Sequence, residues 1–350
     1  MLYLKPNPDL YNVPAKLFDF HGMPYRQLGK TGLRTSAVGL GTWKYGYPET
    51  GDQSRVDGKR AQEIFNRAWE LGVTLWDTAN RYNFASGNSE RVIGEWFRNN
   101  PEKRRDIVLA TKVWGGMDGR TPNHWGLSRG NILDSVHACL ERLQTDHIDL
   151  LYFHRPDPLV DIGESLLAVE DLIREGTVRY FGVSNADKKT LCDYDQFIKT
   201  SGLLRTRICA VQNRFDILRG EVPENQGVLE YAKEENVSFI AWSPLGQGLL
   251  TGRYNDKSKI VKGDRLFDEN SLGVLDGGAI MEKIHWLSAY AESLEVSLAT
   301  LTLAVMLHIT GMGPVIPAAS NVQQLEQNAS AAGITLSQEQ LVEIMKALGE

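Results

Sequence analysis

Four side chains that can carry charge or exchange protons follow short apolar runs of this chain. The run TLWD ends in Asp77, and Tyr82 follows five residues later. The run IVLATK ends in Lys112, and the run IDLLYF is followed by His154. A buried strand that ends in a carboxylate is costly unless the charge has a partner, and Lys112 could be that partner. We therefore predict three strands whose ends point into one site.

These residue types suit the donation of a proton to an oxygen that gains negative charge, as in hydride transfer to a carbonyl. A free tyrosine has a pKa of about 10, and bringing it near neutrality corresponds to about 4 kcal/mol. A nearby ammonium typically supplies much of such a change, so Lys112 is expected to lower the pKa of Tyr82. Asp77 would keep Lys112 charged and oriented, and His154 would orient the carbonyl oxygen or share the proton. The alternative is a purely structural ion pair between two strands.

The three runs belong to a longer alternation of strand and helix patterns. Strands are predicted at 37–43, 73–76, 107–110, 148–153, 178–183, 208–211, 237–242 and 315–316. Helices are predicted at 59–71, 89–99, 128–143, 162–175, 188–200, 224–235, 279–294 and 298–309. Such alternation is typical of crossover units with parallel strands. Eight units favour an α/β fold of the closed (β/α)8 TIM barrel type, whose active site lies at the C-terminal ends of the strands.

The length of 350 residues would allow two domains, but barrels of this kind run as one domain of ~250 residues or more. We predict a single domain over 1–350. It would consist of an N-terminal arm at 1–22, a β-hairpin at 23–37 and the barrel with C-terminal helices at 38–350. The arm is expected to be irregular and packed on the body, with disorder as the alternative. The hairpin prediction rests on a Lys-Thr-Gly turn between two apolar segments.

Three long connections follow strands, at 45–58, 115–127 and 252–278. Long loops on one face of a barrel usually form lids or binding walls. Tryptophans in or beside these loops could line an apolar pocket next to the proton donor. The expected substrate pocket consists of Trp43, Tyr82, Trp114, Trp125 and His154. The alternative is ordinary packing beneath the loops.

Composition excludes several classes of protein. The hydrophobic and charged fractions, 42% and 23%, are those of an ordinary globular protein. A net charge of -6 argues against nucleic acid as the main partner. The N-terminus lacks a signal-peptide pattern, and no apolar run approaches the ~20 residues of a membrane span. Three cysteines without metal-ligand spacing, at 139, 192 and 209, fit buried free thiols in a reducing compartment. We expect a cytoplasmic protein with no membrane partner and no metal, either a monomer or a homo-oligomer.

From about residue 23 to residue 348 the chain resembles the aldo-keto reductases. The shared motifs stand in family order: GLGTW at 39–43, WDTANRY at 76–82, GNSERVIG at 87–94, ATK at 110–112, HRPDP at 154–158, GVSN at 182–185, VQNRF at 211–215, WSPLGQGLLTGRY at 242–254 and IPAASNVQQLEQN at 316–328. The resemblance implies a (β/α)8 barrel with a nicotinamide cofactor across its mouth. The family's four catalytic positions fall on Asp77, Tyr82, Lys112 and His154. The closest subgroup looks like the bacterial reductases related to potassium-channel β subunits.

The resemblance also implies a cofactor site, position by position. The residues expected to hold the nicotinamide are Ser184, Asn185 and Gln212, with Trp242 under its ring. Those expected at the pyrophosphate are Ser243, Leu245, Gln247, Gly248, Arg253 and Arg265. Those expected at the adenosine end are Ser320, Gln324, Gln327 and Asn328. Further expected cofactor contacts are Gly41, Thr42, Trp43, Asp77, Pro244 and Ala318.

Four departures from the family pattern bear on the cofactor and on the catalytic loop. The chain reads Pro-Ala-Ala at 317–319 where the family has Pro-Gly-Ala, so the backbone there must avoid positive φ. Asn321 stands where a lysine or arginine often meets the 2′-phosphate, and Gln327 stands where a glutamate commonly contacts the adenine. NADP(H) is therefore the expected cofactor, with NAD(H) as the alternative. Asn83 replaces the usual glycine after the tyrosine, and asparagine tolerates the left-handed conformation.

The resemblance implies an NADP(H)-dependent oxidoreductase that reduces an aldehyde, ketone or sugar carbonyl, with hydride from the nicotinamide and a proton from Tyr82. One alternative is a non-catalytic or slow NADP(H)-binding regulatory subunit that senses redox state, although channel β subunits carry asparagine at the position of His154. Another is an isomerase or aldolase barrel with Lys112 as Schiff base, against which the GVSN and WSPL segments argue. No GxGxxG motif follows a strand and no HExxH motif occurs, which disfavours a Rossmann dehydrogenase and a metal hydrolase.

Overall fold

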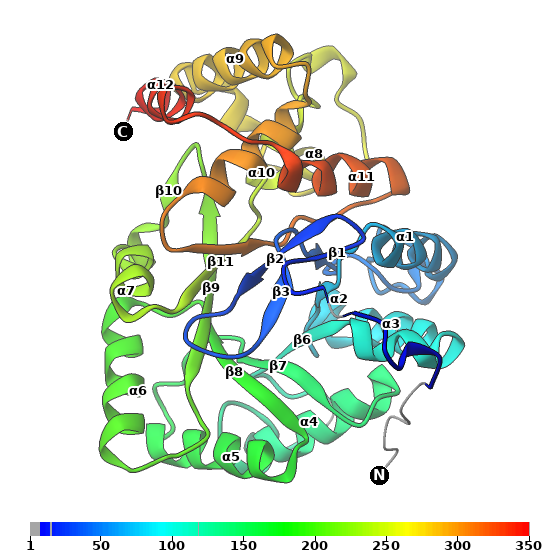
Figure 1. Ribbon diagram of the computed structural model, residues 1–350, viewed down its shortest axis with the longest axis vertical. Coiled ribbons are helices and arrows are strands. Elements are labelled where there is room, and N and C mark those ends of the chain that lie inside the picture. The colour runs from blue at the N-terminus through cyan, green and yellow to red at the C-terminus, as the bar shows by residue number, and fades with distance from the viewer. Residues whose placement is uncertain (1–7, 15, 118, 350) are drawn as a thin grey trace.

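Eight parallel strands form the centre of the protein (Figure 1). A computed structural model describes residues 8–14, 16–117 and 119–349. The strands are β4 (Leu40–Gly41), β5 (Leu75–Asp77), β6 (Val108–Val113), β7 (Ile148–Phe153), β8 (Val178–Ser184), β9 (Ile208–Asp216), β11 (Ser238–Trp242) and β12 (Met312–Val315). They neighbour one another in chain order, and a parallel bridge between Val38 and Val315 joins the two ends of the sheet. The predicted (β/α)8 barrel is confirmed.

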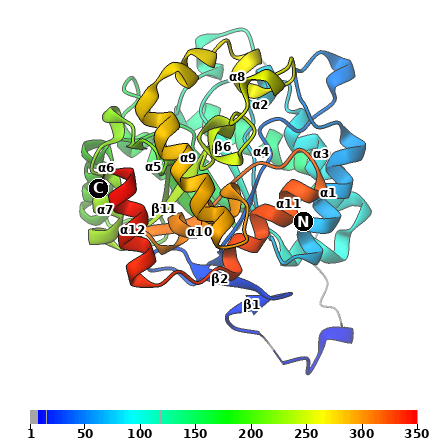
Figure 2. The same ribbon diagram turned by 90° about the horizontal axis from the view of Figure 1, so that it is seen from above.

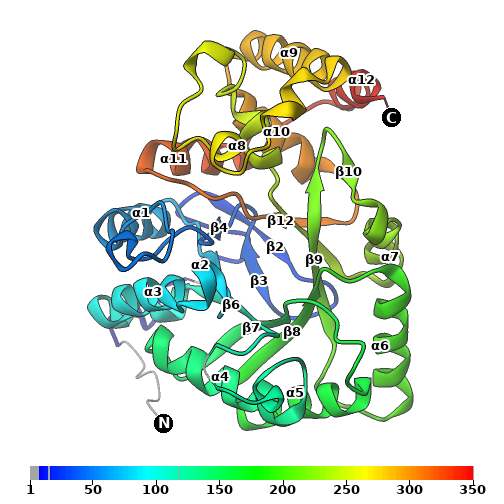
Figure 3. The same cartoon turned by 180° about the vertical axis from the view of Figure 1, so that it is seen from behind.

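Helices surround the strands on the outside of the barrel (Figures 1 and 3). They are α1 (Gly58–Glu70), α3 (Asn88–Asn99), α4 (Arg129–Leu143), α5 (Ile162–Glu175), α6 (Lys188–Thr200), α7 (Val228–Glu235), α10 (Leu298–His308) and α11 (Val322–Ser330). Two more, α9 (Gly278–Ser293) and α12 (Gln338–Leu348), pack against each other at the end of the molecule that is uppermost in Figure 1 and faces the viewer in Figure 2. Short helices occur at α2 (Tyr82–Ala85) and α8 (Arg265–Asp268).

The helix predicted at 224–235 begins later than expected. Pro223–Asn225 forms a separate 3-10 turn, and Gly227 has a left-handed φ of 84° that interrupts any continuation. Helix α7 therefore starts at Val228. Strand β9 instead runs five residues beyond its predicted end, and its last two residues pair with β10 (Gly220–Glu221) in a hairpin.

The N-terminal hairpin consists of β2 (Met23–Gln27) and β3 (Arg34–Ser36), paired antiparallel. Leu28, which follows β2, is fully buried against side chains from β5, β6, β7 and β11 and so closes one end of the barrel. The predicted arm is not irregular throughout, because β1 (Asp19–Phe20) pairs with β2. Residues 1–7 and 15 of that arm lie outside the described residues.

Aromatic packing fixes β5, the strand that carries the first candidate catalytic residue. The ring of Trp76 stacks on Phe65 of α1 at a centroid distance of 4.6 Å and meets Trp96 of α3 edge-on at 4.7 Å. All three side chains are fully buried, and burying an aromatic or large aliphatic side chain contributes roughly 1.5–3 kcal/mol. Because successive side chains alternate across a strand, anchoring Trp76 among the helices directs Asp77 to the barrel side.

Cys139 and Cys209 are buried, but Cys192 is exposed, so the expectation of three buried thiols is wrong for Cys192.

Among the described residues, no single helix is long and apolar enough to cross a membrane. Helices α9 and α10 satisfy that test only as a pair with a 95° bend between them.

Candidate active site

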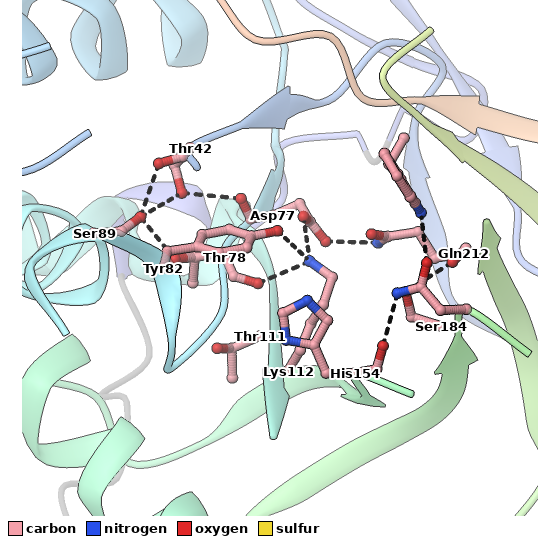
Figure 4. A network of polar contacts seen from close by, with 12 residues as sticks. Thr42, Asp77, Thr78, Tyr82, Ser89, Thr111, Lys112, His154, Ser184 and Gln212 are labelled. Atoms are coloured by element: carbon pink, nitrogen blue, oxygen red, sulfur yellow. Dashed lines mark hydrogen bonds and ion pairs between the residues drawn. The ribbon is translucent and has the colours of Figure 1, made fainter. Parts of the chain in front are cut away.

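Lys112 lies at the centre of a buried hydrogen-bond cluster at the C-terminal ends of β5 and β6 (Figure 4). Its Nζ donates to Asp77 Oδ1 at 2.5 Å, to the Thr78 carbonyl at 2.9 Å and to Tyr82 Oη at 3.0 Å. The other carboxylate oxygen of Asp77 accepts from Gln212 Nε2 at 2.7 Å. All three protons of the ammonium are therefore committed, which fixes its position relative to the phenol.

The backbone after Tyr82 holds an uncommon conformation. Asn83, Phe84 and Ala85 have φ values of 54°, 58° and 60°, and the expected left-handed turn at Asn83 is confirmed. Each non-glycine residue in this region costs roughly 1–2 kcal/mol, which the Asn83 Nδ2 hydrogen bond to the Tyr45 carbonyl at 2.7 Å helps to offset. Such strain clusters at functional sites, and here it sets the direction from which Tyr82 approaches Lys112.

His154 follows β7 and lies beside the phenol. Its ring meets the Tyr82 ring edge-on, with centroids 5.9 Å apart. Its carbonyl accepts from Asn185 Nδ2 at 2.8 Å, which ties it to the end of β8. Burial first, and then the charges of Lys112, Arg155 and Arg81, lowers the pKa of His154 to about 3. The imidazole is therefore neutral, and of its two expected roles the geometry favours orienting an oxygen over sharing a proton.

The pKa of Tyr82 moves in the direction opposite to the one expected. Burial raises it to about 12, and the opposing charge of Lys112 does not cancel that effect. Burial alone would lower the pKa of Lys112, but the charges of Asp77 and Tyr82 outweigh it, so the pKa is raised and the ammonium persists. Tyr82 is a protonated phenol at neutral pH. It can release its proton only when a stronger base, such as a developing alkoxide, lies against it.

These pKa values predict the pH profile of any reduction that uses Tyr82 as acid. The donor is the protonated phenol, whose fraction falls only as the pH rises through about 12. His154 stays neutral above about pH 3. The rate of carbonyl reduction should therefore be flat from about pH 6 to about pH 10. Single-turnover rates in a series of buffers at constant ionic strength would check this, and a drop centred near pH 7 would contradict it.

Ser89 and Glu90 of α3 hydrogen-bond the residues that adjoin the cluster (Figure 4). Ser89 Oγ lies 2.9 Å from the hydroxyls of both Thr42 and Thr78. Thr42 Oγ1 also donates to the Asp77 carbonyl at 3.0 Å. Next to Lys112, Thr111 donates to the buried Glu90 at 2.7 Å. Sequence reasoning assigned no role to Ser89 or Glu90, although both stand in the GNSERVIG motif that it identified.

The residues expected at the nicotinamide lie together beside this cluster. Ser184 Oγ donates to the Gln212 carbonyl at 2.7 Å, and Trp242 Nε1 donates to Asn185 Oδ1 at 3.1 Å. Asn185 is left-handed, with φ at 52°. Since Gln212 also donates to Asp77, a direct hydrogen bond links the expected carboxamide site to the Lys112 cluster.

The expected pyrophosphate region combines left-handed backbone with several cations, of which Arg265 also pairs with Glu269 at 2.9 Å. Ser243, Gln247 and Gly248 have φ values of 56°, 60° and 99°, and turns of this kind aim backbone N–H groups at anions. Arg265 and Lys44 lie over the Trp43 ring, at 4.9 Å and 4.6 Å from its centroid. This donor set fits a diphosphate.

Further cations of this region were not identified from the sequence. Burial and then the charge of Arg55 lower the pKa of Lys44. Arg214 donates to Gln247 Oε1 at 3.4 Å. Arg214 could have been identified from the sequence, because it stands in the VQNRF motif. Nothing in the sequence places Lys44 and Arg55 beside it.

Arg253, which was expected to contact a phosphate, forms an ion pair with the buried Asp264.

At the expected adenosine end, the chain enters α11. Asn321 caps this helix by accepting from the Gln324 backbone N–H at 2.9 Å. Gln324 Oε1 accepts from the Ser320 N–H at 2.8 Å, and Asn328 Nδ2 donates to the Ala318 carbonyl at 3.2 Å. Gln327 is exposed. Residues 317–319 avoid positive φ, as the alanines there require.

The tryptophans of the expected substrate pocket fall into two groups. Trp114 and Trp125 meet edge-on with ring centroids 4.8 Å apart. Trp43 instead contacts the cations Lys44 and Arg265 on the phosphate side. The substrate pocket therefore remains a prediction for all three rings.

Comparison with known proteins identifies the family of this chain. A sequence profile of the Aldo/keto reductase family matches residues 37–348. A putative voltage-gated potassium channel subunit beta of Schizosaccharomyces pombe is 31% identical over 320 residues, which is 90% of this chain and 89% of that protein. A probable voltage-gated potassium channel subunit beta of Arabidopsis thaliana is 29% identical over 328 residues, 89% of this chain and 92% of that protein. With the barrel and a matching profile over nearly its whole length, the chain belongs to the Aldo/keto reductase family.

Proposed function

We propose that this protein is an NADP(H)-dependent oxidoreductase that reduces an aldehyde, ketone or sugar carbonyl to the alcohol in the cytoplasm. The observation that carries the proposal is the single ammonium of Lys112, which hydrogen-bonds both Tyr82 Oη and Asp77 Oδ1. The edge-on imidazole of His154 adjoins it. A bound nicotinamide cofactor would supply the hydride.

Each residue of this group has one task in the proposed reaction. Tyr82 Oη donates its proton to the carbonyl oxygen as negative charge develops there, and Lys112 stabilises the phenolate that remains. Asp77 keeps Lys112 charged and oriented. Neutral His154 donates a hydrogen bond to the same oxygen and holds it against Tyr82. Ser184, Asn185 and Gln212 would hold the carboxamide.

A second candidate function is a slow or non-catalytic NADP(H)-binding regulatory subunit. It is favoured by the names of relatives at about 30% identity, which are called channel subunits. The intact proton-donating group favours catalysis. NADPH oxidation followed at 340 nm across aldehydes, ketones and sugars separates the two functions. A reductase turns over at least one class of carbonyl compound, whereas a regulatory subunit binds NADPH and leaves it unoxidised with all of them.

NADPH is expected to bind more tightly than NADH, but only modestly. The cations of the phosphate region and the backbone N–H groups at the start of α11 suit the 2′-phosphate, which NADPH carries and NADH lacks. Asn321 adds no positive charge there. Asn321→Lys should therefore strengthen the preference by about 1–3 kcal/mol, as is typical of a charge-assisted hydrogen bond. Titration of both cofactors by tryptophan fluorescence would measure the preference. Clearly tighter binding of NADH would overturn the expectation.

The substitution of Asn321 also removes a helix cap, which typically costs about 1 kcal/mol of stability. Gln323→Lys provides the matched control, because it adds the same charge at an exposed position of the same helical turn. It should change the preference for NADPH much less than Asn321→Lys does. Equal effects of the two variants would show that general charge, not a specific contact, sets the preference.

A further inference from the structure

Two arginines that adjoin Tyr82 and His154 in the sequence stack on a pair of tryptophans. Arg81 directly precedes Tyr82, and its Cζ lies 4.6 Å from the centroid of the Trp125 ring. Arg155 directly follows His154, and its Cζ lies 3.6 Å from the centroid of the Trp114 ring. Since the two indoles meet edge-on, the four side chains form one cluster, which we call the Arg–Trp cluster.

The position of Arg81 is built into the fold. Its Nη1 donates to the Gly116 carbonyl at 2.5 Å. Its stem packs so closely on Gly115 that a Cβ added there would lie 2.4 Å from Arg81 Cδ. The loop after β6 therefore holds the guanidinium group in a fixed position.

Within residues 8–14, 16–117 and 119–349, Arg81 and Arg155 contact the Gly116 carbonyl and the two indole rings, and no carboxylate forms an ion pair with either guanidinium. Asp157, in the loop after β7, is occupied by backbone N–H groups, since it accepts from Leu127 at 2.8 Å and from Leu159 at 3.0 Å. Two buried arginines elsewhere in the protein do have such a partner, since Arg104 pairs with Asp149 and Arg142 pairs with Glu90. The part-buried Arg26 instead donates to the carbonyls of Met312 and Leu307.

The two charges also act on each other and on the catalytic group. Burial and then the charge of Arg155 lower the pKa of Arg81. Both guanidinium charges contribute to the low pKa of His154. Stacking on a tryptophan accounts for each arginine by itself. It does not account for two like charges held close together at the site of reduction, where each makes the other less favourable.

We propose that the carbonyl substrate carries an anionic group, a carboxylate or a phosphate, which Arg81 and Arg155 bind while the carbonyl meets Tyr82 and His154. This inference rests on the proposed reductase function and names its substrate class. Guanidinium groups bind both kinds of anion through two parallel hydrogen bonds. The indole faces of Trp114 and Trp125 would hold the apolar body of the substrate between the anion and the carbonyl.

Three para-substituted benzaldehydes of the same skeleton test the proposal with NADPH as reductant: 4-carboxybenzaldehyde, 4-formylphenyl phosphate and neutral 4-formylbenzamide. We expect kcat/KM for at least one anionic aldehyde to exceed that for the amide by about tenfold or more. The larger of the two anionic values identifies carboxylate or phosphate as the recognised group. The preference should shrink as ionic strength rises, because exposed charges are screened. Equal kcat/KM values for all three aldehydes would overturn the proposal.

Substitutions of Arg81 and Arg155 test whether the Arg–Trp cluster causes the preference for anionic over neutral aldehydes. Arg81→Gln and Arg155→Gln should each reduce the ratio of anionic to neutral kcat/KM by about fivefold or more. Arg81→Lys and Arg155→Lys, which keep the charge but lose the planar fork, should fall between glutamine and wild type. The control is Arg98→Gln, on the exposed face of α3, which should leave the ratio unchanged. A ratio that survives both glutamine substitutions would remove these arginines from substrate recognition.

A binding measurement separates failure of this inference from failure of the reductase function. Isothermal titration calorimetry should show benzoate binding at least about tenfold more tightly than benzamide, with the difference lost in Arg81→Gln. If benzoate binds in this way but no aldehyde is reduced, the anion site stands and the reductase function fails. If neutral and anionic aldehydes are reduced equally and benzoate does not bind, the reductase function stands and the anion site is wrong.

Discussion

Replacing Lys112 with methionine is expected to abolish carbonyl reduction and to destabilise the fold at the same time. In the proposed reaction the ammonium stabilises the phenolate form of Tyr82, so without it the proton transfer would lose its electrostatic support. The substitution also leaves Asp77 without its counter-charge in a fully buried position. Removing one partner of a buried ion pair typically costs about 3–5 kcal/mol. Chemical denaturation and NADPH oxidation would measure the two losses on one preparation.

Two further variants distinguish a buried pair from a general effect of substitution. Lys189→Met removes a lysine that pairs with Asp193 at the surface of α6, and it should alter stability by less than about 1 kcal/mol. Asp77→Asn combined with Lys112→Met removes both buried charges and should recover part of the stability lost in Lys112→Met, because the orphaned carboxylate is gone. Unchanged stability in Lys112→Met would refute the buried pair and the account of Tyr82 built on it.

Tyr82→Phe is expected to remove the chemistry and keep the binding. The substitution deletes one hydroxyl and retains the ring, so the edge-on contact with His154 can persist. Loss of a general acid typically lowers the rate by about 10²–10⁴-fold. Cofactor affinity should change by less than about threefold, which is below about 0.7 kcal/mol, because the hydroxyl contacts Lys112 and not the phosphate region.

The matched control for Tyr82→Phe is Tyr290→Phe on α9. Its hydroxyl bonds Glu343 on α12, so it loses a comparable hydrogen bond away from the barrel mouth. Steady-state kinetics should show near wild-type reduction in Tyr290→Phe and a large loss in Tyr82→Phe. Comparable losses in both would indicate that the phenol matters for the fold and not for proton donation.

The barrel could be predicted because the periodic spacing of apolar residues marks each strand and each helix along the chain. Alternating apolar runs and helical patterns indicate crossover units, and eight of them leave little choice but a barrel. Helix boundaries depend on single residues, and the start of α7 was missed because Gly227 is left-handed. Helix α12 was expected only as part of a C-terminal group without bounds, although Ser337 and Gln340 form a capping box that marks its start.

The site was predictable in its residue types and less so in its electrostatics. Strand ends bring Asp77, Lys112 and His154 to one rim, and this follows from the parallel order of β5, β6 and β7. The pKa of Tyr82 depends on how completely the loop after β5 buries the phenol, and residue types alone do not give the extent of burial. The Arg–Trp cluster depends on the path of the loop after β6, which brings Gly116 to Arg81.

Proton donation by Tyr82, while hydride passes from bound NADPH to a carbonyl, is the step on which the proposed function depends. Stopped-flow absorbance at 340 nm can follow this step, with wild type and Tyr82→Phe each preloaded with one equivalent of NADPH and mixed with the best aldehyde of the panel. We expect the wild type to consume its bound NADPH in a single exponential and Tyr82→Phe, equally loaded, to be at least about 100-fold slower. Equal rates in the two proteins, or a wild type that leaves its NADPH unoxidised, would show that Tyr82 is not the proton donor of a carbonyl reduction.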